Sequence, residues 1–246
     1  MIRRLSVSLP RPTGAGQPGP KSHAVPPGDR PIRLLAVSDE IDPSLWGHLD
    51  REALASLDLL VSTGDLPPDY LSYLEGSLRV PFVFVMGNHD LDDAWAREAG
   101  RLLPWRKSGA HLTEAAGVAI ALLDWPGGDK IRTRSQDWIA WRQVLGLWLA
   151  VRIGARRPEI VVSHVAPDQV LDPRDVYHRS FAAYRWLARR LRPALWLHGH
   201  TTPASVPERV THLGPTTSVN VTGAYLIELE PAVTSAGEPS AAPPDG

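Results

Sequence analysis

Five short apolar runs in this chain are each followed by a side chain that can bind a divalent metal ion. The runs are almost entirely aliphatic or aromatic, and they are short enough to be buried β-strands. In an open α/β sheet, ligands collect outside the carboxyl ends of the strands, so donors far apart in the sequence can converge there. The sequence therefore predicts one metal site at five strand exits. The runs cover residues 32–38, 59–62, 82–86, 160–163 and 194–197, and the donors are Asp39, Asp65, Asn88, His164 and His200.

The types of these donors indicate a transition ion. Two imidazoles together with carboxylate and amide oxygens suit Mn, Fe or Zn better than Mg or Ca. In isolation, an Asp such as Asp65, which follows a glycine, is usually a turn residue, and a His such as His164 is usually a hydrogen-bonded core residue. Their occurrence in one set of strand exits favours metal binding over both alternatives.

The local sequences around these donors resemble the calcineurin-like metallophosphoesterases. That family carries Asp-x-His, Gly-Asp, Gly-Asn-His-Asp or Glu, an isolated His after a strand, and Gly-His-x-His, in this order. The resemblance implies a four-layer αββα sandwich, an α/β fold of mixed α+β type in which two mixed β-sheets are flanked by helices. The matching segments are SDEI at 38–41, GD at 64–65, GNHD at 87–90, SH at 163–164 and HGHTT at 198–202.

Two positions depart from the family pattern. Ile41 replaces the histidine of Asp-x-His, and Thr202 replaces the second histidine of Gly-His-x-His. In the family these two histidines bind the same metal. The resemblance therefore implies one tightly bound ion and a second, weaker ion that keeps only Asp39 and the bridging Asp65. The complete ligand set would be Asp65, Asn88, His164 and His200.

The second ion would need further ligands from water, from the substrate or from a nearby carboxylate. Glu40 and Asp42 are the nearby carboxylates. Neither is an obvious replacement, because Glu40 is expected on the opposite face of the strand exit and Asp42 comes one residue after the missing histidine.

The resemblance also assigns a proton donor. In the family, the histidine of Gly-Asn-His donates to the leaving oxygen, and a carboxylate keeps its ring oriented and protonated. His89 occupies that position here, and Asp90 and Asp69 are the candidates for the carboxylate. Asp90 could instead cap a helix that begins near residue 91. The implied reaction is hydrolysis of a phosphodiester or phosphomonoester by a metal-activated water.

A second hypothesis is a non-catalytic scaffold or interaction subunit with the same fold. Loss of two ligands of one metal is what the start of such a change would produce. Retention of the other ligand set together with His89 favours hydrolysis, because loss without selection would strike ligands indiscriminately. The expected partner is a phosphoester substrate, and the sequence predicts neither its identity nor an oligomeric state.

Composition limits the class of protein. The chain has 246 residues, of which 43% are hydrophobic, so it can build a substantial core. Its net charge of −1 argues against general nucleic-acid binding. It has no cysteine and no long apolar run, so we expect no disulfide, no membrane contact and a cytoplasmic location.

Segments rich in Pro, Gly and Ala bound a central domain. We expect residues 1–30 and 231–246 to be disordered tails, since they cannot bury enough apolar surface, and residues 31–230 to form the metallophosphoesterase domain. Trp138, Trp141 and Trp148 are expected on the buried face of a helix, and Trp125 in a loop above the metals. Helices are expected over 43–56, 90–100, 137–155 and 176–191, and a strand meander over 209–213, 218–221 and 224–230.

Overall fold

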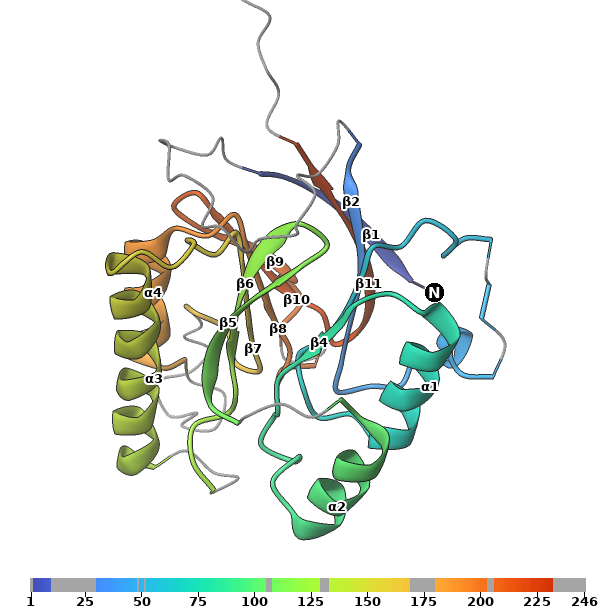
Figure 1. Cartoon of the computed structure of the whole chain (residues 1–246), viewed down its shortest axis with the longest axis horizontal. Helices are drawn as coiled ribbons and strands as arrows, with labels where there is room; N and C mark the ends of the chain where they lie inside the picture. The colour runs from blue at the N-terminus through green and yellow to red at the C-terminus, as the bar shows by residue number, and fades with distance from the viewer. Residues whose placement is uncertain are drawn as a thin grey trace, which may run out of the picture.

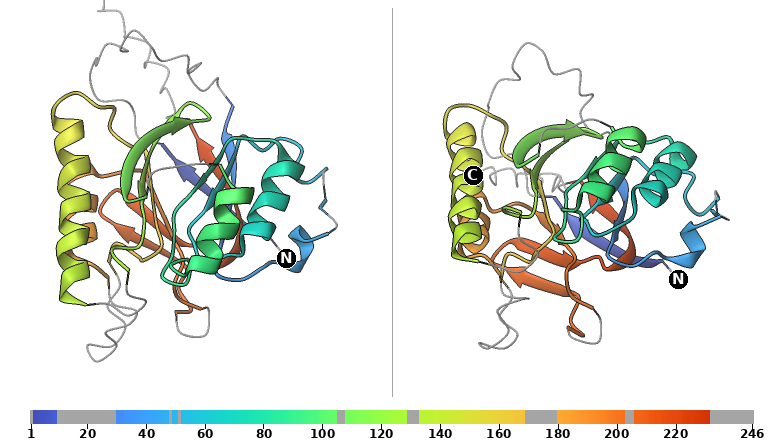
Figure 2. Two further views of the ribbon diagram at one scale, coloured as in Figure 1. Left: turned by 60° about the horizontal axis from the view of Figure 1, so that its bottom comes forward. Right: turned by 90° about the horizontal axis from the view of Figure 1, so that it is seen from below.

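Two mixed β-sheets pack face to face, and helices cover the outer face of each sheet (Figure 1). This computed structural model describes residues 2–9, 30–47, 49–50, 52–104, 108–128, 133–168, 180–202 and 206–231. Figure 2 shows the same layers from two other directions, with α3 on one outer side and α1 and α2 on the other. The predicted four-layer sandwich is therefore confirmed.

The first sheet has five strands in the order β1-β11-β2-β3-β4. Strands β2, β3 and β4 run parallel, so their carboxyl ends lie at one edge, whereas β11 is antiparallel to β2. Helices α1 (Pro68–Leu78) and α2 (Asp93–Leu102) pack on its outer face. The strands are β1 (Arg3–Ser8), β2 (Ile32–Ser38), β3 (Leu59–Ser62), β4 (Phe82–Phe84) and β11 (Gly223–Glu230).

The second sheet has six strands in the order β5-β6-β7-β8-β10-β9. Strands β6, β7, β8 and β10 are parallel, and β5 and β9 are antiparallel edges. Helices α3 (Arg134–Arg152) and α4 (Ala182–Leu191) cover its outer face. The strands are β5 (Ala110–Ala115), β6 (Val118–Leu123), β7 (Ile160–Ser163), β8 (Leu195–His198), β9 (Val210–Leu213) and β10 (Thr216–Asn220).

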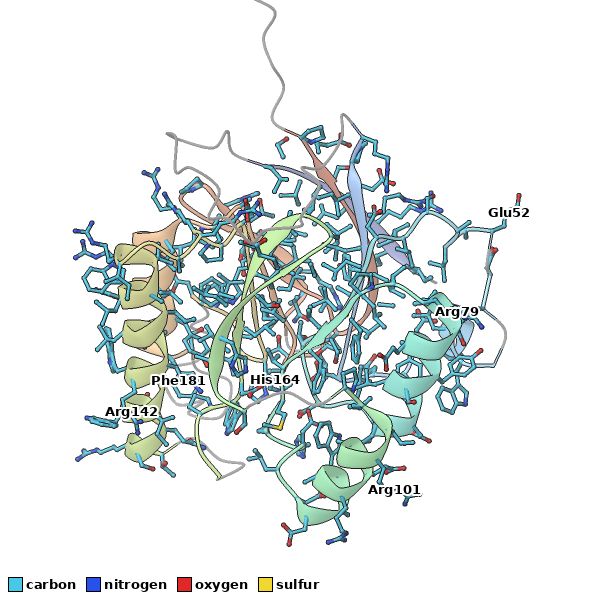
Figure 3. All side chains as sticks on the ribbon, in the orientation of Figure 1. Glu52, Arg79, Arg101, Arg142, His164 and Phe181 are labelled. Atoms are coloured by element: carbon cyan, nitrogen blue, oxygen red, sulfur yellow. The ribbon has the colours of Figure 1, made fainter. Side chains whose placement is uncertain are left out.

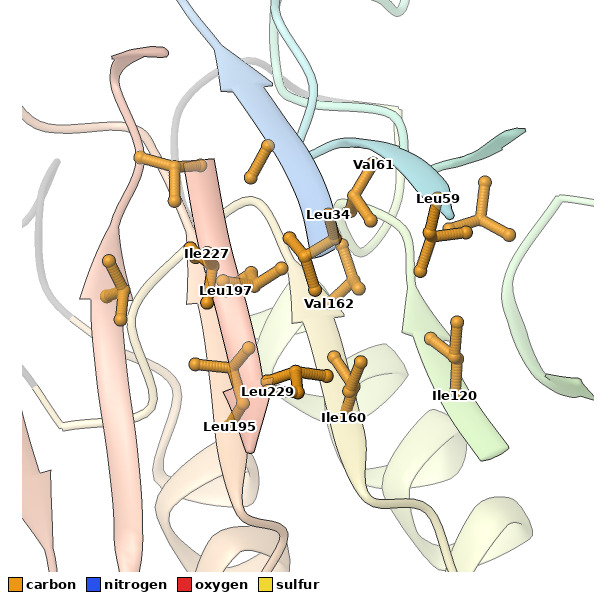
Figure 4. Close-up of a cluster of buried hydrophobic side chains, with 14 of the residues drawn as sticks. Leu34, Leu59, Val61, Ile120, Ile160, Val162, Leu195, Leu197, Ile227 and Leu229 are labelled. Atoms are coloured by element: carbon orange, nitrogen blue, oxygen red, sulfur yellow. The ribbon is translucent and has the colours of Figure 1, made fainter. Parts of the chain in front are cut away.

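Alternate residues of the central strands supply different parts of the core. In β2, Leu34 and Ala36 join the cluster between the two sheets, while Leu35 and Val37 pack toward the helices. Figure 4 shows the inter-sheet cluster, in which Leu34 and Val162 come from different sheets. Burial on both faces explains why these strands are continuous apolar runs.

Some predicted elements differ from the structure. The predicted tail at residues 1–30 is wrong for Arg3–Ser8, because this segment forms β1 and pairs in parallel with β11. Without β1, strand β11 would be an edge strand with unpaired backbone N–H and C=O groups, and β1 pairs with these groups. The side chain of Val7 adds apolar burial. Residues 10–29 and 232–246 lie outside the described residues, so the rest of both tails stays a prediction.

Two further differences concern helices and the end of the chain. The helix predicted over 43–56 is reduced to a 3₁₀ turn at Pro43–Leu45 in the described part of that segment, and α1, which Pro68 begins, was not predicted. The predicted meander is wrong for its last strand, because β11 does not pair with β10 and belongs to the other sheet. Among the described residues, no helix is long and apolar enough to cross a membrane.

Candidate metal centre

The predicted donors follow strands of two sheets, not of one open sheet. Strands β2, β3 and β4 lead to Asp39, Asp65 and Asn88 from the first sheet. Strands β7 and β8 lead to His164 and His200 from the second. Figure 3 shows His164 between the two halves of the sandwich. The site therefore spans the seam between the sheets, where parallel strands of both end.

His164 is the centre of the cluster. Its Nε2 atom lies 3.0 Å from Asn88 Oδ1, 3.1 Å from Asp65 Oδ2 and 3.1 Å from His200 Nδ1. One possible ligand atom from each of Asp65, His164 and His200 lies within 4.8 Å of the others. Asn88 and His164 are fully buried, and Asp65 is half-buried. The structure thus brings four of the five predicted donors into direct contact.

The hydrogen bonds of His164 show what this cluster can hold. Its Nδ1 atom lies 2.9 Å from the carbonyl oxygen of Thr63. A carbonyl only accepts, so Nδ1 carries the proton and donates it, and in the neutral ring Nε2 is left with a lone pair. That lone pair faces the oxygens of Asn88 and Asp65, which are also acceptors. A cation at this point would satisfy all of them.

Electrostatics at the site agree with this geometry. Burial lowers the pKa of His164, but the Asp65 charge and hydrogen bond outweigh burial and raise it to about 9. For Asp65, burial acts to raise the pKa, but His164 and the backbone N–H of His89 outweigh burial and bring the pKa below its usual range. The negative charge gathered here therefore favours a bound positive charge, whether a proton or a metal ion.

Asp39 is held differently from the other donors. Both of its carboxylate oxygens lie 3.1 Å from the backbone nitrogen of His200, which donates to them. The hydroxyl groups of Ser38 and Thr222 also donate to its Oδ2 atom. Asp39 therefore reaches the rim of the site with its oxygens already engaged by neighbouring groups. No motif in the sequence indicates the contribution of Thr222, which lies far along the chain.

A cavity of about 330 Å³ opens beside the cluster and is lined by Asp39, Asp65, His89 and His200. His89 is exposed to it, while its backbone N–H donates to Asp65 Oδ1 at 2.8 Å. Trp125 is buried behind the cluster, with its ring 5.5 Å from that of His200. Trp125 therefore lies in a loop beside the candidate ligands, as expected, but its ring is buried against them.

Glycines in the motifs allow the strand exits to approach one another. A Cβ atom on Gly87 would lie 2.7 Å from Asp65 Cγ and 2.9 Å from His164 Cε1. A Cβ atom on Gly199 would overlap the Asp39 carboxylate and lie 2.9 Å from Ser38 Cβ. Any larger residue at either position would displace a predicted donor. Close contact with the loops that carry Asp65 and Asp39 thus explains why glycine precedes Asn88 and His200.

The backbone itself turns sharply at the donors. Asp39 and Asp65 have φ values of 58°, and His200 has a φ of 68°. This left-handed conformation is uncommon outside glycine, although Asp and His adopt it more readily than most residues. Three candidate donors therefore sit one to three residues after the end of a strand, in a backbone conformation that few residues other than glycine adopt.

The two candidate partners of His89 have other contacts in the structure. Asp90 is buried, and its Oδ2 atom accepts from the backbone N–H groups of Asp65 and Gly87, both at 2.8 Å. The alternative in which Asp90 caps a helix is wrong, because Asp92 caps α2 by accepting from Trp95. Asp69 is exposed in the first turn of α1. Which carboxylate orients the His89 ring stays a prediction.

We expect Asp90→Ala to lower the free energy of unfolding by about 2–4 kcal/mol, because two backbone N–H groups lose their acceptor. Asp90→Asn is the matched control. Both hydrogen bonds end on the same carboxyl oxygen, so the single amide oxygen of Asn can accept them. Burial, and after it the charge of Asp65, raises the pKa of Asp90 to about 7, so a neutral side chain suits this position. Urea unfolding of the three proteins measures the difference. Equal stability of Asp90→Ala and the wild type would contradict this structural role.

The fold and the cluster together define the class: a layered α/β protein with metal-capable side chains where the strands of its two sheets end. The chain belongs to the calcineurin-like phosphoesterase family, whose family model matches residues 35–203.

Solved structures resemble this chain at low sequence identity. TT1561 of Thermus thermophilus is 15% identical with a TM-score of 0.53, and the match covers 78% of this chain and 90% of that one, so the two share a fold. Vacuolar Protein Sorting 29 from Cryptosporidium parvum is 15% identical with a TM-score of 0.39, over 79% and 76% of the two chains. No curated protein sequence matches this chain.

Proposed function

We propose that this protein is a metal-dependent phosphoester hydrolase with one tight metal site and one weaker one. One observation carries the proposal: three possible ligand atoms lie 3.0–3.1 Å from His164 Nε2. They are Asn88 Oδ1, Asp65 Oδ2 and His200 Nδ1. This cluster borders a cavity that also exposes an imidazole, His89. A cation site beside a potential proton donor is the combination that phosphoester hydrolysis needs.

The proposed ligands of the tight ion are Asp65, Asn88, His164 and His200. Their mixture of imidazole nitrogen with carboxylate and amide oxygen favours Mn, Fe or Zn. The Thr63 carbonyl would hold the His164 ring with Nε2 turned inward, as the outer partners of ligating histidines commonly do. When bound, the ion would supply positive charge for the phosphoryl oxygens and would lower the pKa of water.

We propose His89 as the proton donor to the leaving oxygen. Its backbone N–H donates to Asp65 Oδ1, and this hydrogen bond holds the residue close to the proposed ligands. Its side chain lies at the exposed wall of the cavity and can therefore meet a bound substrate. We infer that His89 protonates the departing alkoxide, while Asp65 and His164 would hold the ion that faces the phosphoryl oxygens.

The weaker second site follows from the surroundings of Asp39. Its oxygens already accept from the backbone of His200 and from the Thr222 hydroxyl. Ile41, at the position of a family ligand, is 41% exposed and offers no donor atom. A second ion would have to displace hydrogen bonds and would gain few protein ligands. The proposed second ion therefore binds with lower affinity than the first.

Restoring the missing histidines tests this explanation. Ile41→His combined with Thr202→His is expected to tighten the second ion by more than the product of the two single effects, because both side chains would serve one metal. Calorimetric titration of chelator-treated protein with Mn measures both affinities. Two equally tight equivalents in the wild type would contradict the proposal, and would assign the missing donors to other groups such as Glu40 or Asp42.

Hydrolysis is distinguished from the scaffold hypothesis by two measurements on the purified wild type. We expect about one equivalent of transition metal after purification without chelator, and Mn-stimulated hydrolysis of a phosphomonoester or phosphodiester in a substrate screen. Absence of both metal and hydrolysis would favour a non-catalytic subunit. The phosphoester substrate and the cytoplasmic location remain parts of the proposal.

A further inference from the structure

The outer face of α3 is unusually apolar for a surface helix. Four large side chains on it are exposed: Trp138 by 63%, Leu145 by 46%, Leu149 by 53% and Ile153, which caps the helix, by 77%. They recur at intervals of seven, four and four residues, so they form one stripe along the helix. The buried face is the opposite one and includes Ala140, Val144 and Leu147. The prediction that Trp138 is part of the core is therefore wrong.

An aromatic seam joins this stripe to the neighbouring helix. The Trp186 ring of α4 packs edge to face against Trp141 at 5.7 Å and against Trp148 at 5.8 Å. All three rings are half-buried, so part of each still faces outward. Helices α3 and α4 lie side by side on the outer side of the second sheet (Figure 1). The apolar stripe is thus one edge of a wider surface that spans two helices.

Arginines stand over the rings of this surface. The guanidinium carbon of Arg142 lies 5.2 Å from the Trp138 ring, and that of Arg190 lies 5.6 Å from the Trp186 ring. Arg152 lies 5.9 Å from a third ring, that of Trp148. Arginine can keep its stem on apolar surface while its guanidinium stays at the polar boundary. The surface therefore presents apolar groups and positive charges side by side. Figure 3 shows Arg142 at the outer side of α3.

The positive charge is local. The sequence of α3, RSQDWIAWRQVLGLWLAVR, has three arginines, all exposed, and one acid, Asp137, which is half-buried in the first turn. The sequence of α4, AAYRWLARRL, has three arginines and no acid, and Arg185 among them forms an ion pair with Asp168. On the other side of the sandwich, α1 has the sequence PDYLSYLEGSL, with two acids and no basic residue. Because the whole chain has a net charge of −1, the basic excess distinguishes this one side.

We propose that the surface formed by α3 and α4 docks on an anionic lipid membrane. Exposed Trp, Leu and Ile next to Arg are the side chains that partition into the boundary between headgroups and acyl chains. Lipid phosphates and carboxylates complement the guanidinium groups, which bind such groups in a bidentate manner. A second copy of this chain is disfavoured as the occupant, since a two-fold contact would place arginines against arginines.

Peripheral docking differs from the expectation of no membrane contact. That expectation rested on the lack of a long apolar run, which excludes only a spanning helix. A helix that lies in the plane of the interface needs an apolar face and basic side chains, and α3 has both. The proposal is independent of the metal site, because its residues are on the outer layer of the second sheet.

Sedimentation with vesicles tests the proposal on the full chain. We expect binding to vesicles of phosphatidylcholine mixed with phosphatidylserine, weak binding to phosphatidylcholine alone, and loss of binding at high salt. Arg142→Gln with Arg152→Gln should reduce the partition coefficient about thirty-fold, from about 1 kcal/mol per arginine near an anionic surface. The matched control is Arg97→Gln with Arg101→Gln, two exposed arginines of α2, which should leave binding unchanged.

The apolar contribution needs its own variant. Leu145→Gln with Leu149→Gln removes two exposed side chains and should abolish vesicle binding without affecting metal content, whereas Leu102→Gln, at an exposed leucine of α2, should not. Tryptophan emission should shift to the blue on addition of anionic vesicles, and Trp138→Phe should reduce the shift.

Three outcomes would overturn the proposal. The first is equal binding by the α3 and α2 arginine variants. The second is no binding of the wild type to either vesicle. The third is self-association in ultracentrifugation that Leu145→Gln with Leu149→Gln abolishes while vesicles are not bound, which would assign the surface to a second copy of the chain.

Discussion

His164→Ala should purify folded but without tightly bound metal, and its phosphoesterase activity should fall to background. The side chain is fully buried, and its Nε2 atom contacts three other possible ligand atoms. Removing an outer partner of a metal ligand already costs about 10–100-fold in affinity, so loss of the proposed central ligand should cost more. Metal analysis and a Mn-dependent rate assay measure the two effects.

The control for this variant is His212→Ala, which removes an exposed imidazole from the edge strand β9. It should retain both metal and rate. Circular dichroism and urea unfolding separate metal loss from unfolding, and His164→Asn keeps a polar side chain in the cavity if the alanine variant is unstable. Full activity in a folded His164→Ala protein would refute the ligand assignment.

His89→Asn should show the opposite separation, with metal retained and turnover reduced. The side chain faces the cavity, and the backbone N–H of His89 makes the hydrogen bond to Asp65, so substitution leaves that bond in place. Loss of a general acid costs about 10²- to 10⁴-fold in rate. The reduction should be largest for substrates with poor leaving groups, because an activated phenolate departs without protonation.

Two comparisons make this test specific. Metal stoichiometry of His89→Asn should equal that of the wild type, in contrast to His164→Ala. Asp69→Asn, which alters an exposed carboxylate of α1, should show the same dependence on the leaving group if Asp69 orients the His89 ring. Unchanged turnover of His89→Asn on a poor leaving group would falsify the proton-donor assignment.

The predictable part of this fold is the part with a repeated local signal. Strands β2, β3 and β7 have the predicted bounds, because residues buried on both faces leave a continuous apolar run in the sequence. The strand β1 has no such signal, since most of its residues are exposed and its pairing depends on an edge far along the chain. The placement of β11 in the first sheet likewise depends on tertiary contacts.

The orientation of α3 shows how periodicity can mislead. A face containing Trp138, Trp141 and Trp148 satisfies helical spacing, and large apolar side chains are usually buried. The helix instead buries Ala140 and Val144, keeps Trp141 and Trp148 half-buried against the same core, and leaves Trp138 exposed. Spacing identified the helix, but the residue sizes alone could not identify which face packs inward.

At the candidate site, the order of the motifs and the family resemblance grouped Asp65, Asn88, His164 and His200 as candidate donors, and these four residues are in contact in the structure. The sequence did not show the individual surroundings of each residue. It did not show that the backbone of His200 donates to Asp39, because that contact depends on loops 161 residues apart.

If the proposed ion binds, the left-handed backbone at Asp39, Asp65 and His200 makes the stability of the fold depend on metal supply. Each such residue stores conformational energy, and Asp39 and Asp65 add negative charge to the same cavity. An ion bound only by the folded chain stabilises it by about 2.7 kcal/mol at a free concentration one hundred times its dissociation constant. The melting temperature should therefore rise with the concentration of free metal. Under metal starvation, we expect the same chain to be less stable and therefore easier to degrade.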